Sequence, residues 1–130
     1  MAYQNKSYVE HIAVRVKDIH WFIQFFEEAL GMPVVNWTGN QENPDQAWLA
    51  GGIQLISDSS NPNSRLDHIA IVTENLEKAV HEAINRGGKK FYKGPNWIEL
   101  PDGLVIELIQ QAGSEVDDFL NVKVSYVPVP

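Results

Sequence analysis

The sequence predicts an α+β domain built from two βαβββ modules, with mixed curved sheets and with helices packed outside them. The first observation is a repeat: the strand-like segment around His11 recurs, 57 residues later, around His68, and a helical pattern follows each copy. The second is that three short strand-like segments follow each helical pattern. Repetition at so long a period indicates two copies of one supersecondary unit.

The composition limits the possible functions. A chain of 130 residues with 44% hydrophobic and 21% charged residues is typical of one globular domain. The net charge of −7, with only 10 lysines and arginines, argues against a nucleic-acid or anionic-membrane partner. The absence of cysteine excludes disulfides, thiolate metal sites and thiol catalysis. The first residues lack the pattern of a signal peptide, so a cytoplasmic location is expected.

The first module, residues 8–57, begins with a strand over residues 8–17, in which the side chains alternate with the period of a half-buried strand. Residues 19–30 change to helical spacing, and their apolar residues follow i, i+3, i+4, i+7 and i+11. Asp18 is a suitable N-cap, and Gly31 a suitable C-terminal stop. Three further strands are expected at 34–37, 46–50 and 53–56, the last two joined at Gly51-Gly52.

A polar linker, residues 58–64, precedes the second module, residues 65–110. The predicted elements repeat there in the same order: a strand at 65–73, a helix at 75–86, and strands at 89–92, 96–100 and 104–109. The turn at 101–103 has the Pro-Asp-Gly sequence of a tight reversal. Residues 111–130 form a tail outside the repeat, which we expect to dock on this domain or on a partner subunit because its end is apolar. The whole of 1–130 is therefore predicted to be a single domain.

Four polar side chains are predicted to share one face of these strands. In the last strand of each module the flanking apolar residues should face the helix, so Gln54 and Glu107 face the opposite side. His11 and His68, on the first strands, face that same side. Two imidazoles, a carboxylate and an amide oxygen suit a divalent metal such as Fe, Ni, Zn, Co or Mn.

Other interpretations of these residues stay open. A single histidine on a strand is usually a hydrogen-bonded structural residue, and only the equivalence of His11 and His68 in the repeat, with Glu107 opposite, favours a metal site. Gln54 could ligate the metal directly, or could hydrogen-bond a metal-bound water or a substrate. His20 and His81 lie on the predicted helices and are expected to be solvated.

Three further residues are candidates for binding substrate. Arg15 shares its strand face with His11 and could bind a carboxylate or phosphate, or could form a salt bridge at the end of the strand. Trp48 and Trp97 could line a cleft or belong to the core.

Taken together, the motifs resemble the vicinal oxygen chelate superfamily, which contains glyoxalase I, methylmalonyl-CoA epimerase, fosfomycin-modifying enzymes, bleomycin-resistance proteins and extradiol dioxygenases. The resemblance covers about residues 8–110. The segments that carry it are Glu-His-Ile-Ala at 10–13, Asp-His-Ile-Ala at 67–70, Ala-Leu-Gly-Met at 29–32, and Pro-Asp-Gly at 101–103 through Ile-Glu-Leu at 106–108.

The resemblance implies a glyoxalase-like fold, in which the two modules curl into an open barrel around a metal. The family's ligand positions fall on His11, Gln54, His68 and Glu107. Many isomerase members have Glu where this chain has Gln54, whereas the epimerases resemble it in having Gln. A neutral amide ligand leaves more positive charge on the metal and cannot accept a proton. The catalytic carboxylates are therefore expected to be Glu107 or a non-ligand acid such as Glu99.

Three classes of function remain at this point. The favoured one is a metal-dependent isomerase or lyase that acts on a small oxygenated metabolite through a metal-stabilised enolate or alkoxide. The alternatives are an Fe(II) extradiol-type dioxygenase, and a non-catalytic binding or resistance protein that sequesters a flat ligand. Family members of this length commonly dimerise, so a homodimer is expected.

Overall fold

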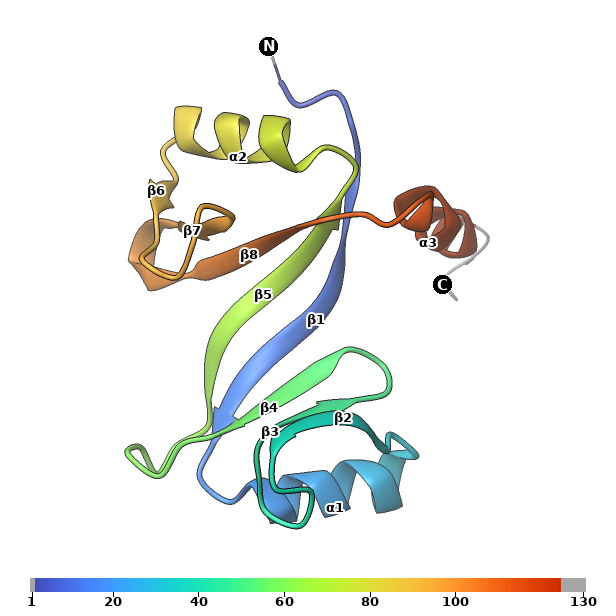
Figure 1. Cartoon of the computed structure of the whole chain (residues 1–130), viewed down its shortest axis with the longest axis vertical. Helices are drawn as coiled ribbons and strands as arrows, with labels where there is room; N and C mark the ends of the chain where they lie inside the picture. Colours follow the sequence, from blue (N-terminus) through green and yellow to red (C-terminus); the bar gives the residue numbers. More distant parts are fainter. Residues whose placement is uncertain (1, 125–130) are drawn as a thin grey trace, which may run out of the picture. The chain divides into compact units, whose positions relative to one another are not determined.

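The computed structural model describes residues 2–124 of the chain, which contain the predicted succession of elements (Figure 1). The first module comprises β1 (Ser7–Val16), α1 (Ile19–Leu30), β2 (Val34–Gly39), β3 (Pro44–Leu49) and β4 (Ile53–Ser57). The second comprises β5 (Arg65–Thr73), α2 (Leu76–Asn85), β6 (Lys89–Lys90), β7 (Trp97–Glu99) and β8 (Val105–Gln110). A single 3-10 turn, η1 (Pro101–Gly103), separates β7 from β8, and α3 (Glu115–Val124) follows.

The strands form one mixed sheet, as predicted. Their hydrogen-bonded order is β2-β3-β4-β1-β5-β8-β7-β6. β1 and β4 pair in parallel, whereas the β2–β3, β3–β4, β6–β7 and β7–β8 pairs are antiparallel. The α+β class and the two βαβββ modules are thus confirmed.

The described residues divide into two compact units: residues 11–69, and residues 2–10 with 70–124. The division passes through β1 and β5, and the segment that precedes β1 bonds to residues at and just after the end of β5. There the Tyr3 hydroxyl lies 2.7 Å from the Thr73 hydroxyl, and the Lys6 backbone N–H donates to Glu74 over 2.6 Å. The prediction of a single domain divided at a 58–64 linker stays a prediction.

In the unit of residues 11–69, α1 covers the apolar face of β3 and β4. The helix begins after Asp18, whose carboxylate accepts from the Trp21 backbone N–H, and ends at Gly31, which has the left-handed φ of 68°. Leu55, 1% exposed, lies at the centre of the core on this face. Its buried partners are Val16, Ile19, Ala47 and Leu49. The prediction that alternate residues of the last strand face the helix is therefore confirmed here.

In the other unit, α2 packs on β7 and β8. Asn75 caps the helix by accepting from the Lys78 backbone N–H, and Ile98 at the middle of β7 is fully buried. Asp102 takes a positive φ of 64° in the turn before β8, a conformation that Asp tolerates better than most residues. The turn predicted at 101–103 is confirmed.

The sequence did not indicate α3. Val116 is fully buried, and the ring of Phe119 stacks on that of Tyr8 at a centroid distance of 4.3 Å, so the helix docks on its own unit. The alternating valines after residue 121 obscured the helical pattern. The signal available in the sequence was the group of acidic residues in the first turn of α3, since negative charge is favourable near a helix N-terminus. The last part of the predicted tail, residues 125–130, lies outside the described residues.

Among residues 2–124, no helix is long and apolar enough to cross a membrane.

Candidate metal centre

Gln54 occupies the predicted face of its strand. It is 5% exposed, and it lies beside Ala13 in the parallel β1–β4 ladder, two residues along β1 from His11. Residues two apart on a strand share a face, so His11, Ala13 and Gln54 face the same side. The Gln54 Nε2 group donates to the Gln46 Oε1 atom over 2.7 Å. That bond fixes the amide and leaves Oε1 as the atom that could ligate a metal.

The two histidines lie close together. His11 on β1 is 9% exposed and His68 on β5 is 4% exposed, and the Nε2 atoms of both are buried. Their ring centroids are 5.6 Å apart, with an interplanar angle of 78°. Two imidazoles this close to one another are so placed that one metal ion could bind both.

The Asp67 carboxylate holds His68. The His68 Nδ1 atom lies 2.6 Å from Asp67 Oδ2, and both side chains are almost buried. The other oxygen of Asp67 accepts from Arg15 Nε, also over 2.6 Å. The sequence motif contained Asp67, but its role was missed, and an acidic residue directly before the histidine was the available signal.

Arg15 lies between two carboxylates. Besides its bond to Asp67, its Nη1 atom is 3.3 Å from Asp58 Oδ2, an oxygen that Arg65 also binds over 2.7 Å. Burial alone would lower the pKa of Arg15, but the bonds and charges of Asp67 and Asp58 raise it. Arg15 thus forms salt bridges, which was one of the two alternatives predicted for it. Substrate binding by Arg15 stays a prediction.

Asp58 stands in a polar turn. Hydrogen bonds from the hydroxyl and backbone N–H of Ser60, with the charges of Arg65 and Arg15, lower the pKa of Asp58 from 3.8 to about 2.

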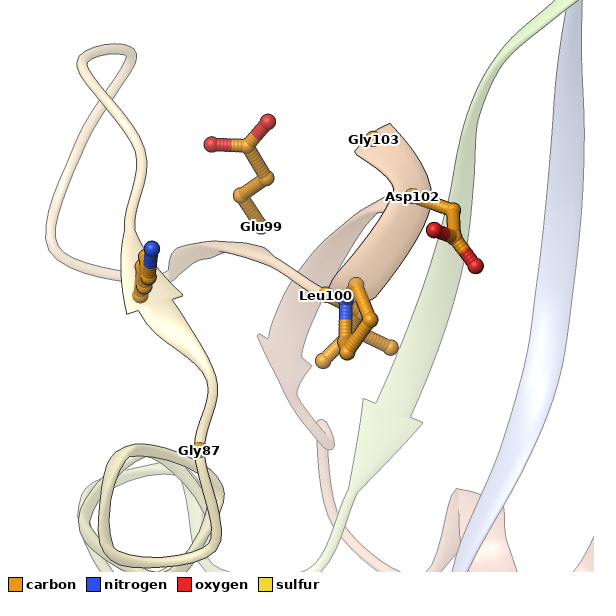
Figure 2. Close-up of a pocket in the computed structure, with 7 residues that line it drawn as sticks. Gly87, Glu99, Leu100, Asp102 and Gly103 are labelled. Carbon is orange, nitrogen blue, oxygen red and sulfur yellow. The ribbon is translucent and has the colours of Figure 1, made fainter.

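Glu107 and two further predicted residues share one face of the second unit. Trp97 is paired directly with Glu107 across the β7–β8 ladder, and Glu99 is paired with Val105. Glu99 and Glu107 are therefore diagonal neighbours on adjacent strands. Residues in this relationship are typically about 7–8 Å apart. Glu99 also lines a pocket of about 300 Å³ together with Lys89 and Asp102 (Figure 2). The lining is completed by Gly87, Leu100, Pro101 and Gly103.

Trp48 occupies the equivalent position in the first module. It lies directly opposite Gln54 in the β3–β4 ladder and is half-buried, as is Trp97. Neither tryptophan is a fully buried core residue. Lys93 Nζ lies 4.9 Å from the centre of the Trp97 ring, which is a cation–π distance. His20 and His81, by contrast, are exposed on α1 and α2, as predicted.

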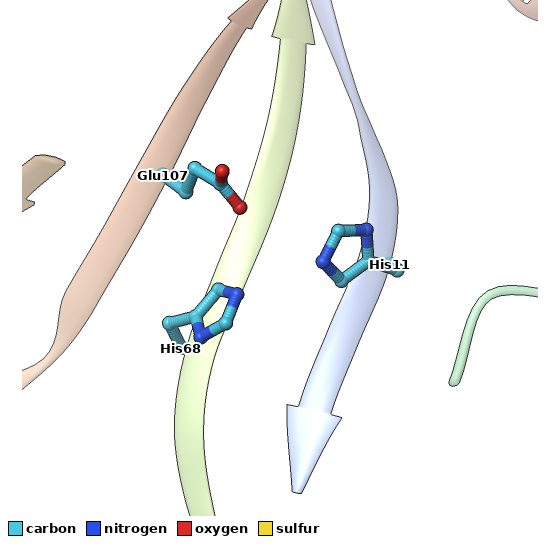
Figure 3. A group of neighbouring side chains, drawn as sticks. All are labelled: His11, His68 and Glu107. Atoms are coloured by element: carbon cyan, nitrogen blue, oxygen red, sulfur yellow. The ribbon is translucent and has the colours of Figure 1, made fainter. Parts of the chain in front are cut away.

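His11, His68 and Glu107 form the group that could hold a metal ion. Each offers one ligand atom, and these atoms all lie within 4.8 Å of one another (Figure 3). Two imidazole nitrogens and one carboxylate oxygen fit a borderline divalent metal and would leave coordination positions for further ligands. The donor set therefore agrees with the metal that the sequence predicted, without selecting its identity.

Comparison with solved structures identifies the fold. This chain is similar to methylmalonyl-CoA epimerase from Mycobacterium tuberculosis, with a TM-score of 0.61 and 20% identity. The similarity covers 84% of this chain and 91% of the epimerase. A variant of the Streptomyces coelicolor methylmalonyl-CoA epimerase, in complex with 2-nitronate-propionyl-CoA, is similar over 81% of this chain and 97% of that one, with a TM-score of 0.59 and 20% identity.

The Mn(II)-bound glyoxalase from Novosphingobium aromaticivorans is also similar, over 78% of this chain and 38% of that one, with a TM-score of 0.59 and 20% identity. No family model matches the chain, and no curated protein sequence matches it. The chain thus has the glyoxalase-like fold of these solved structures, as its sequence predicted.

Proposed function

We propose that this chain is a metal-dependent isomerase or lyase that moves a proton on a small oxygenated metabolite. The observation that carries the proposal is the group formed by His11, His68 and Glu107, whose ligand atoms lie within 4.8 Å of one another. A protein that only sequesters a flat ligand does not need this donor set. The similar structures support the proposal, because two are methylmalonyl-CoA epimerases and one is a Mn(II)-bound glyoxalase.

A divalent ion held by these residues would act as a Lewis acid for negative charge that develops on a substrate oxygen. Gln54 would be a fourth, neutral ligand. Its Nε2 group is already bonded to Gln46, so Oε1 is the end that is suitably oriented. Since an amide ligand adds no negative charge, the set of His11, Gln54, His68 and Glu107 would leave one net positive charge on a divalent ion.

Proton transfer requires a carboxylate that can reach the substrate carbon. Glu99 is our candidate, since it shares a sheet face with Glu107 as its diagonal neighbour. The pocket of about 300 Å³ that Glu99 lines contains none of the proposed metal ligands, so the sheet face and not the pocket supports this assignment. Glu107 is the second candidate, if it leaves the metal during turnover. Trp48 and Trp97 each lie directly opposite a proposed ligand, and each would exclude water from that ligand.

The test is hydrogen exchange at carbon. The protein, loaded in turn with Mn²⁺, Co²⁺ or Ni²⁺ under argon, is incubated in D₂O with carbonyl compounds that carry an acidic α-hydrogen, methylmalonyl-CoA among them. We expect metal-dependent deuterium incorporation, followed by NMR. Absence of exchange with every compound, together with strict Fe(II) dependence and oxygen consumption on a catechol, would contradict the proposal in favour of the dioxygenase alternative.

We also propose that the protein is a cytoplasmic homodimer, as dimerisation is common among members of this size. Light scattering over a range of protein concentrations tests the dimer, and a monomer mass at all concentrations would contradict it.

A further inference from the structure

We propose that Asp67 is a positioning residue of the metal centre, and that it fixes the tautomer of His68 so that the Nε2 atom can bind a metal. This inference rests on the proposed function, because it assigns His68 a metal to bind. The tautomer of His68, however, can be measured in the protein before any metal is added.

The contact that carries the inference joins neighbours along β5. His68 Nδ1 lies 2.6 Å from Asp67 Oδ2, and the side chains are 5% and 11% exposed. An ionised carboxylate can only accept hydrogen bonds, so a hydrogen bond at this distance requires the proton on Nδ1. In the neutral ring the lone pair is then on Nε2, and Nε2 is buried.

Adjacent strand residues normally point to opposite faces, so the carboxylate needs a second anchor to turn toward His68. Arg15 supplies it, because its Nε atom donates to Asp67 Oδ1 over 2.6 Å while Oδ2 faces the imidazole. Arg15 is held in turn by Asp58. The guanidinium thus orients the carboxylate, and the carboxylate orients the ring.

Carboxylates that accept from the second nitrogen of a ligating histidine raise its basicity and fix its orientation, and their loss typically costs 10- to 100-fold in metal affinity. The same arrangement explains why Arg15 lies on the face of β1 that carries His11. In the proposed site Arg15 serves His68 through Asp67 rather than contacting the metal.

The experiment compares wild-type protein with D67N and with the matched control D117N. D117N makes the same chemical change at an exposed aspartate on α3 that bonds to Lys6, outside the chain of contacts from Asp58 through Arg15 and Asp67 to His68. Nitrogen-15 NMR of the metal-free proteins, at a pH where imidazole is neutral, gives the His68 tautomer. Titration with Mn²⁺, followed by electron paramagnetic resonance of the unbound ion, gives the affinity, and circular dichroism checks that the variants fold.

We expect the Nδ1–H tautomer in wild type and D117N, a shift toward Nε2–H in D67N, and an affinity for Mn²⁺ that is 10- to 100-fold weaker in D67N alone. An Nε2–H tautomer in the wild type would overturn the inference without recourse to any variant. So would an unchanged tautomer and affinity in D67N. If the wild type binds no Mn²⁺ but D67N shifts the tautomer as expected, the positioning role of Asp67 stands and the proposed function fails.

Discussion

Trp48 lies directly opposite Gln54 across the β3–β4 ladder, so that a half-buried indole is the immediate neighbour of a proposed metal ligand. The same relationship recurs in the second module, where Trp97 lies opposite Glu107. The internal repeat therefore extends beyond the ligands to the aromatic residues beside them. What differs between the modules is the charge at the ligand position, which is neutral at Gln54 and negative at Glu107.

Substitution of Gln54 by glutamate should strengthen metal binding and weaken the metal as a Lewis acid. The added carboxylate brings a negative charge to the donor set, whereas the wild-type amide brings none. We expect the dissociation constant for Mn²⁺, measured by calorimetry, to fall by about tenfold, which corresponds to about 1.4 kcal/mol. The control is Q46E, which changes the partner of Gln54. An unchanged or weaker affinity in Q54E would argue against ligation by Gln54.

Substitution of Glu99 by glutamine should remove proton transfer without removing the metal. A positioned general base contributes about 100- to 10,000-fold, so deuterium incorporation should fall by a factor in that range. The Mn²⁺ affinity should stay within a factor of two of wild type. E77Q, a change of an exposed glutamate on α2, is the matched control and should leave both quantities unchanged. If E99Q exchanges at the wild-type rate, Glu107 becomes the preferred candidate for the base.

Asp58 should make the stability of the protein depend on pH in the acid range. Its pKa is lowered from 3.8 to about 2 in the folded protein, so the folded state favours the ionised form. The stabilisation is fully present above pH 4 and is lost as the pH falls toward 2. Urea unfolding of wild type and D58N should therefore differ at pH 6 and converge near pH 2. A difference that is constant across this range would contradict the assignment.

The sequence predicted most of the fold because the repeat and the strand and helix periods agree with each other. The bounds of α1 and β5 coincide with the predicted ranges 19–30 and 65–73, and Asp18 and Gly31 cap α1 as expected. β6 is shorter than predicted, ending at Lys90 rather than at Tyr92. Strand ends of this kind depend on pairing with a neighbouring strand, which side-chain pattern alone does not determine.

The face of the sheet on which each side chain lies was also predictable, since alternation along a strand puts Gln54 on one face and Leu55 on the other. The contacts that each side chain makes could not be predicted. That Asp67 would turn to His68 depends on Arg15, which comes from another strand 52 residues away in the sequence. The sequence likewise left the face of Glu99 undecided, because only the pairing of Glu99 with Val105 places it beside Glu107.

Metal content is the most direct measure of whether His11, His68 and Glu107 form a metal centre. Protein purified without an affinity tag is saturated with Mn²⁺, passed through a desalting column, and analysed by inductively coupled plasma mass spectrometry. H68A is compared with H81A, which removes an exposed histidine from α2. We predict close to one metal ion per chain in wild type and H81A, and less than about one tenth of that in H68A, because loss of a ligand should weaken binding by at least the 10- to 100-fold that loss of an outer-shell partner costs. If the wild-type protein retains no metal, or if H68A and H81A retain equal amounts, His68 is not a metal ligand and the proposed metal centre is wrong.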